Sequence, residues 1–115
     1  MTRLFRWLSI YESKAQKLRI TGEVERSFEA DILKNPEKGA ILKHTGGVRK
    51  VRVGEEGRGK SGSYRFFYLD LPHVERTYVM YVIAKGGQEN ISRDEEKLLR
   101  ALVERVKQEV RDEEN

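Results

Sequence analysis

The stretch Val48-Arg49-Lys50-Val51-Arg52-Val53 decides the fold, because basic and apolar side chains alternate along its second half. Alternation with a period of two places Lys50 and Arg52 on one side of a β-strand, with Val51 and Val53 on the other. The valine side can pack on a core, while the basic side prefers water or an anion. The stretch therefore predicts a strand with one wet, cationic face.

The rest of the chain divides into short runs of helical or strand period around this strand. Helix signals include Thr21 as an N-cap and the capping-box pattern of Ser92 with Glu95. The predicted elements are a strand at Phe5 to Leu8, helices at Ser9 to Leu18 and Gly22 to Lys34, strands at Val48 to Val53, Ser63 to Leu69 and Thr77 to Ala84, and a helix from Ser92 with apolar residues Leu98, Leu99, Leu102, Val103, Val106 and Val110 on one stripe.

This order of elements predicts an α+β fold with a small antiparallel sheet, two N-terminal helices and a C-terminal helix. The last three strands are close in sequence and should form an antiparallel meander. We expect the helices to cover one face of the sheet and to leave the other face free. The charged tail from Arg111 to Asn115 is expected to fray. At 115 residues, the whole chain, 1–115, is expected to form a single domain.

Charge is distributed unevenly along the chain. The net charge is +4, which by itself indicates little about partners. Residues 43–65 hold 7 basic and 2 acidic side chains, whereas residues 89–115 hold 6 basic and 9 acidic ones. The first of these segments suits binding to a phosphate backbone, and the alternative is an ordinary solvated strand face.

Arg65 is the most informative single residue, because it interrupts the aromatic run Tyr64-Arg65-Phe66-Phe67-Tyr68. An arginine there must face solvent, a ligand or a partner, or else stack on the neighbouring rings. The string Gly59-Lys60-Ser61 has the spacing of a P-loop with Gly54. A P-loop needs a helix after it, and a strand follows here, so we reject a nucleotide site.

Other chemistries have little support. The chain has no cysteine, so disulfides and thiolate catalysis are excluded, and a cytoplasmic location is expected. His44 and His73 are too few to predict a metal site, and no metal or cofactor is expected. Glu55 and Glu56 are interpreted as solvated loop residues, with a catalytic base as the less favoured alternative. The N-terminus has too short an apolar run for a signal peptide or a membrane span.

Four motifs in order resemble the HigB branch of the RelE toxin superfamily, from about Glu25 to Val110. They are Asn35-Pro36-Glu37-Lys38-Gly39, His44-Thr45-Gly46-Gly47-Val48-Arg49-Lys50-Val51-Arg52, Gly57-Arg58-Gly59-Lys60-Ser61-Gly62 and Tyr64-Arg65-Phe66-Phe67-Tyr68, followed by Asn90-Ile91-Ser92-Arg93-Asp94-Glu95-Glu96. The resemblance implies a RelE-like fold, similar to microbial ribonucleases. It also implies a toxin that cleaves messenger RNA in the ribosomal A site until a cognate helix-turn-helix antitoxin neutralises it, with operator DNA bound only through the antitoxin complex.

The resemblance also implies roles for individual residues. Lys50 or Lys85 would act as base or acid, and Arg52 and Arg65 would stabilise the phosphorane. The residues expected to bind RNA are Arg49, Arg58, Lys60, Tyr64 and Tyr81.

Two positions depart from the family pattern: Ser61 stands where relatives often have a basic residue, and Ile83 where they often have a tyrosine. Tyr81 is a displaced substitute for that tyrosine. Two other functions stay open, namely a noncatalytic RNA- or ribosome-binding protein on the same fold and a structural partner that acts only in operon repression.

Overall fold

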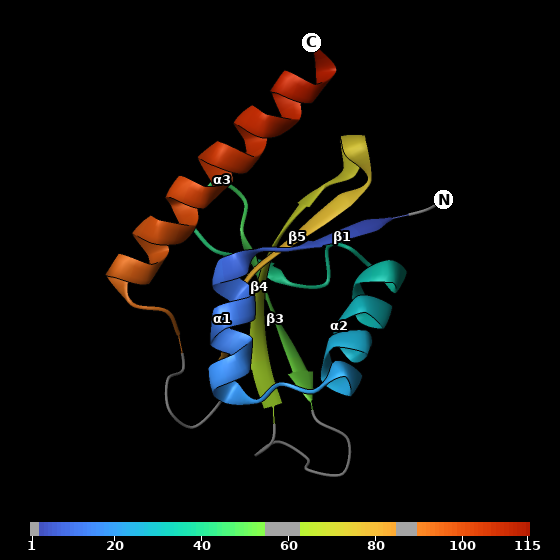
Figure 1. The fold of residues 1–115 in the computed structure, drawn as a ribbon, viewed down its shortest axis with the longest axis vertical. Coiled ribbons are helices and arrows are strands. Elements are labelled where there is room, and N and C mark those ends of the chain that lie inside the picture. Colours follow the sequence, from blue (N-terminus) through green and yellow to red (C-terminus); the bar gives the residue numbers. More distant parts are fainter. Residues whose placement is uncertain (1–2, 55–62, 85–89) are drawn as a thin grey trace.

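The computed structural model describes residues 3–54, 63–84 and 90–115 (Figure 1). Five strands, three helices and one short 3₁₀ turn make up this part of the chain. In chain order they are β1 (Leu4–Trp7), α1 (Ser9–Leu18), α2 (Gly22–Lys34), β2 (Ala40–Ile41), β3 (Arg49–Gly54), β4 (Ser63–Leu71), the turn η2 (Pro72–Val74), β5 (Arg76–Ala84) and α3 (Arg93–Glu114).

The strands form one sheet in the order β1-β5-β4-β3-β2. The pairs β3–β4 and β4–β5 are antiparallel, which confirms the predicted meander. β1 pairs with β5 in parallel, so the sheet as a whole is mixed. The α+β class is confirmed, with the two predicted N-terminal helices and the C-terminal one.

Helices α1 and α2 cover one face of the sheet. Their buried residues Tyr11, Val24 and Phe28 pack with Val51 of β3 and Phe66 of β4 in a single core. The rings of Phe28 and Phe66 are stacked, with centroids 4.8 Å apart. The predicted N-cap of α2 is present, since the Thr21 hydroxyl accepts a hydrogen bond from the Val24 amide.

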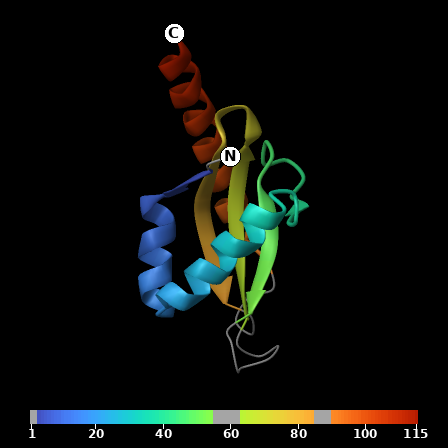
Figure 2. The ribbon, with the colours of Figure 1, turned by 90° about the vertical axis from the view of Figure 1, so that its right-hand side faces the viewer.

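The expectation that the other face of the sheet is free is wrong, because α3 packs across it. Figure 2 shows α3 on the far side of the sheet from α2. Leu99 and Val103 of α3 form a second core with Phe67 of β4 and Met80 of β5. The long apolar stripe on α3 is unfavourable in water, so the helix packs against a separate face of the sheet.

Helix α3 also extends further than expected. The tail predicted to fray is helical as far as Glu114, and Arg76 of β5 forms an ion pair of 2.8 Å with Glu113. At the other end, the capping box of Ser92 and Glu95 is present as predicted. None of the described helices combines the length and the apolar character that a bilayer-spanning segment needs.

A buried ion pair fixes the start of the chain to the sheet. The guanidinium of Arg3 contacts the Asp70 carboxylate, and both side chains are at least nine-tenths buried. Thr77, which is fully buried, donates its hydroxyl to the same carboxylate at 3.2 Å. These contacts join the segment before β1 to β4 and β5, which explains how so short a strand keeps its place at the sheet edge.

Candidate functional site

Three predicted site cations lie in one row on the α3 face of the sheet. Lys50 and Arg52 alternate with Val51 and Val53, whose side chains are buried in the α1–α2 core. Across the ladder Arg52 pairs with Arg65 of β4. Because residues paired across a strand ladder point to the same side, the three cations share one face, as the sequence predicted for Lys50 and Arg52.

The two arginines of this row differ in their side-chain hydrogen bonds. Arg52 donates from Nε to the hydroxyl of Ser63 at 3.2 Å. The Nε atom of Arg65 is buried, and it has no hydrogen-bond partner among the residues that the structure describes. A buried guanidinium nitrogen without a partner is costly to folding and calls for an explanation, such as a catalytic role or a bound ion. Arg65 therefore has a hydrogen-bond donor that its described neighbours leave unused.

The strand that carries Lys50 is held in place from the opposite face. Gly39 donates its amide to the Tyr68 hydroxyl at 3.0 Å, and that hydroxyl donates to the Pro36 carbonyl at 2.8 Å. Arg49 lies on this side too, where its guanidinium donates to the Gly39 carbonyl at 2.7 Å. The structure thus separates Arg49 from Lys50, Arg52 and Arg65, and gives it contacts that anchor the chain beside β3.

Tyr81 lies on the same face as the cation row. It pairs with Phe67 in the β4–β5 ladder, and its hydroxyl donates a hydrogen bond of 2.5 Å to the Glu95 carboxylate. Burial, followed by the hydrogen bond and the negative charge of Glu95, raises the pKa of Tyr81 to about 12. The ammonium of Lys14 lies 5.3 Å from the Tyr81 ring centre. Sequence reasoning recognised Glu95 only as a helix-capping residue, because its contact with Tyr81 depends on the tertiary fold.

The remaining predicted residues are placed differently. Tyr64 points to the α1–α2 side and packs against that core, away from the three cations. Ile83 shares the face of Tyr81 but is only 1% exposed, and it belongs to the α3 core. Arg58, Lys60, Ser61 and Lys85 lie outside the described residues, and so do Glu55 and Glu56.

The two histidines are far apart in the sequence and lie in different turns of the structure. His73, in the turn η2, is 3.6 Å from the Glu114 carboxylate at the C-terminal end of α3. His44 stands in the turn before β3 with a positive φ of 65°. Within residues 3–54, 63–84 and 90–115, no three histidine or carboxylate side chains are grouped so as to hold a metal ion.

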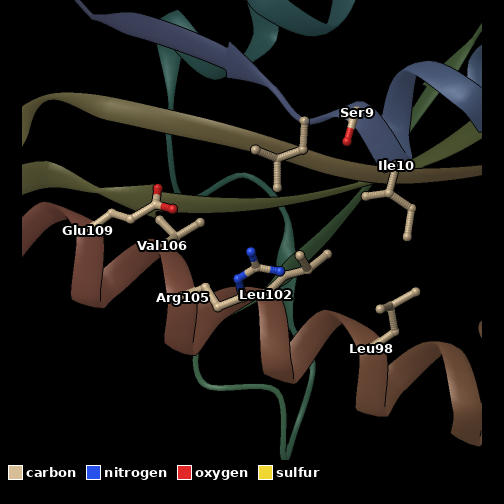
Figure 3. A pocket seen from close by; sticks show the side chains of 8 residues that line it. Ser9, Ile10, Leu98, Leu102, Arg105, Val106 and Glu109 are labelled. Atoms are coloured by element: carbon tan, nitrogen blue, oxygen red, sulfur yellow. The ribbon is translucent and has the colours of Figure 1, made fainter.

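A separate hollow of about 360 Å³ opens between the start of α1 and α3 (Figure 3). Leu98 and Leu102 of α3 line it opposite Ile10, with Arg105 and Glu109 further along the helix. It contains none of the predicted site residues. Its lining is mixed apolar and charged, unlike the basic row on the strands.

The comparison with protein families decides the assignment. The family described as the RelE toxin of the RelE/RelB toxin–antitoxin system matches residues 13–114, which is most of the chain. This protein belongs to the RelE toxin family. Membership confirms the superfamily that the sequence motifs indicated, and it implies a place in a toxin–antitoxin pair.

A solved member of the RelE family has the same fold. The structure of E. coli toxin RelE in the free state, an arginine-to-alanine double mutant, aligns with a TM-score of 0.53 at 16% sequence identity. The alignment covers 77% of this chain and 90% of that one. At this identity the match supports the architecture alone, and the chemistry has to be argued from this chain's own side chains.

Proposed function

We propose that this RelE-family protein is the toxin of a type II toxin–antitoxin pair and an endoribonuclease that cleaves messenger RNA in the ribosomal A site. The observation that carries the proposal is the row of Lys50, Arg52 and Arg65 on one sheet face, with the Arg65 Nε buried and unpartnered. A row of fixed cations is what a phosphodiester and its more highly charged transition state require.

The proposed reaction needs no metal. The ribose 2′-oxygen loses its proton and attacks the adjacent phosphorus, the bond from phosphorus to the 5′-oxygen breaks, and that oxygen takes up a proton. The products are a 2′,3′-cyclic phosphate and a free 5′-hydroxyl. Arg52 and Arg65 stay charged throughout and stabilise the phosphorane, since guanidinium groups match phosphate oxygens in bidentate geometry.

Proton transfer is assigned to lysine. Lys50 lies two residues before Arg52 on the same strand face, which makes it the described lysine proposed to serve the phosphate that the arginines would hold. Lys85, directly after β5, is proposed as its partner, so that one lysine serves as base and the other as acid. Arg58 and Lys60, in the segment between β3 and β4, are proposed to bind RNA, as is Tyr81. Arg49 and Tyr64, which were also expected to bind RNA, lie on the opposite face of the sheet and are not included in this proposed surface.

The proposed partners extend beyond the message. As a toxin–antitoxin family member, the protein has an antitoxin as its expected mate. We propose that this antitoxin is a helix-turn-helix protein, that operator DNA is bound only through the complex, and that the toxin acts in the cytoplasm.

A noncatalytic ribosome-binding protein is the second candidate, and one observation favours it. Ile83, at the position where the resemblance expects a tyrosine, is 1% exposed and part of the core. The nearby Tyr81 has its hydroxyl engaged by Glu95. Binding alone requires the same cations but no proton transfer.

Induced expression distinguishes the two candidates. The proposed toxin causes growth arrest with messages cut inside coding regions, and mapping of 5′ ends finds free 5′-hydroxyls. Arrest with intact messages would favour the binding protein instead. Absence of arrest would leave only a structural role in operon repression.

A further inference from the structure

Basic side chains line one edge of helix α3, which the net charge of the helix does not reveal. The helix holds six basic and eight acidic side chains, so its net charge is negative. Five of the six basic residues nevertheless recur at helical spacing along one edge. They are Arg93, Lys97, Arg100, Lys107 and Arg111.

This basic edge faces the turn that leads into β3. Lys107 donates from Nζ to the Gly46 carbonyl at 2.9 Å, which fixes the orientation of the helix. The opposite edge faces β5, where Glu95 accepts from Tyr81 and Glu113 pairs with Arg76. Acidic contacts thus hold one edge of α3, and its cations gather on the other.

A cavity of about 280 Å³ lies along the N-terminal half of the basic edge. Its lining, among the described residues, is His44, Arg93, Glu96, Lys97 and Arg100. Arg93, Lys97 and Arg100 are all exposed, and no described carboxylate forms an ion pair with any of them. Three cations against the single carboxylate of Glu96 leave the cavity attractive to anions.

The turn that presents His44 is rigid. The Thr45 hydroxyl, fully buried, donates to the Leu42 carbonyl at 2.7 Å and accepts from the Val48 amide at 3.1 Å. His44 itself adopts the left-handed region, with a φ of 65°, and its side chain is exposed. Because the turn is closed by these bonds, the imidazole is held at the cavity without the cost of ordering a loop.

The cavity and the cation row lie on the same side of the molecule. Lys50 and Arg52 are on the sheet face that α3 covers, and β3 is the strand that follows the His44 turn. Both groups therefore belong to the surface between β3 and the basic edge of α3. An RNA chain held at Arg65 has a path over Lys50 toward Arg100 along cations from both elements.

We propose that the cavity of His44, Arg93, Lys97 and Arg100 binds backbone phosphates of RNA outside the scissile position. This inference rests on the proposed function for the identity of the polyanion. Arginine and lysine bind phosphate without reading the base, so the site contributes affinity and orientation and adds no sequence preference.

The test measures binding of a fluorescent RNA of about 20 nucleotides and mixed base composition. Binding is followed by fluorescence anisotropy over a series of salt concentrations. The variant is Arg93→Gln/Lys97→Gln/Arg100→Gln, in an Arg65→Gln background so that the RNA stays intact. Loss of three phosphate contacts should lower the slope of log affinity against log salt by about 2 and weaken binding about tenfold or more. The matched control, Lys17→Gln/Arg26→Gln/Lys34→Gln on α1 and α2, should change the slope much less.

A second variant tests the same site in the opposite direction. Glu96→Gln removes the cavity's carboxylate and should tighten RNA binding, whereas a helix that is merely damaged would never bind more tightly. If the triple variant keeps the parent slope, or if it and the control lose affinity equally, the cavity does not bind RNA. Glu96→Gln with unchanged or weaker binding would also overturn the proposal.

These readouts are independent of cleavage. If the parent protein fails to cut messages but the triple variant loses affinity, the proposed enzyme activity fails and the phosphate site stands. If messages are cut and the slope is unchanged, the phosphate site fails and the enzyme activity stands.

Discussion

Arg52 and Arg65 lie directly opposite each other across the β3–β4 ladder. Like charges at paired positions of two strands repel, and the buried Arg65 Nε adds an unsatisfied donor to that cost. The pair is readily explained if an anion sits between the two guanidinium groups during function.

Neutralising Arg65 should therefore stabilise the folded protein. We expect Arg65→Gln to raise the free energy of unfolding by about 0.2–1 kcal/mol at low salt, with a smaller gain at 1 M salt because the repulsion is screened. Urea denaturation measures the change, and Arg26→Gln on α2 serves as an exposed control. A loss of stability greater than the control's would show that Arg65 stacks in a structural role.

Gly39 should tolerate no side chain. A Cβ there would lie 2.8 Å from the Lys50 carbonyl oxygen and 3.0 Å from the Tyr68 ring, so Gly39→Ala must displace β3. We expect a loss of about 1–3 kcal/mol in the free energy of unfolding. Gly54→Ala is the matched control, since a Cβ at Gly54 meets nothing within 4 Å. Equal effects of the two substitutions would contradict the close approach.

The buried pair of Arg3 and Asp70 should show strong coupling. Arg3→Met leaves the Asp70 carboxylate buried without its partner and should cost about 3–5 kcal/mol in urea denaturation. Adding Asp70→Asn should recover part of that loss, so the double variant is more stable than the sum of the single changes predicts. Additive effects would mean that the two side chains act independently.

The raised pKa of Tyr81 follows from its burial and from its contact with Glu95. The folded-state pKa of about 12 exceeds the usual value of 10, so the protonated phenol stabilises the fold below pH 10 and that contribution is lost as the pH rises toward 12. Tyr81→Phe should reduce the fall in melting temperature over this range. Glu95→Gln should lower the pKa of Tyr81 toward 10. The titration of Tyr81 is followed as the part of the tyrosinate absorbance that the Tyr81→Phe substitution removes. An unchanged absorbance curve in Glu95→Gln would rule out the coupling.

Local signals were enough to predict most elements of the fold. The period of two at Lys50–Val53, the Thr21 cap and the capping box of Ser92 each depend on neighbours in sequence, and each is present as expected. The partner of a strand depends on the tertiary fold instead. The parallel pairing of β1 with β5, and the packing of α3 on the opposite sheet face from α1 and α2, had no local signal.

The candidate site was predictable to a similar degree. Alternation placed Lys50 and Arg52 together, and the aromatic run marked Arg65. Arg49 and Tyr64 were expected to bind RNA as well, but they lie on the opposite face of the sheet from these cations. The contact of Glu95 with Tyr81 and the cavity that His44 shares with α3 both arise from packing between distant segments, so no local pattern in the sequence reveals them.

Cleavage of a ribosome-bound message by Arg65→Gln tests the central claim most directly. The substrate is a short defined transcript bound to purified ribosomes. The cleavage rate is measured under single-turnover conditions, and the melting temperature of each protein is measured in parallel. We predict a loss of about a hundredfold or more in the rate, because one transition-state cation is removed, with a melting temperature at or above that of the parent. Cleavage at the parent rate would contradict the account.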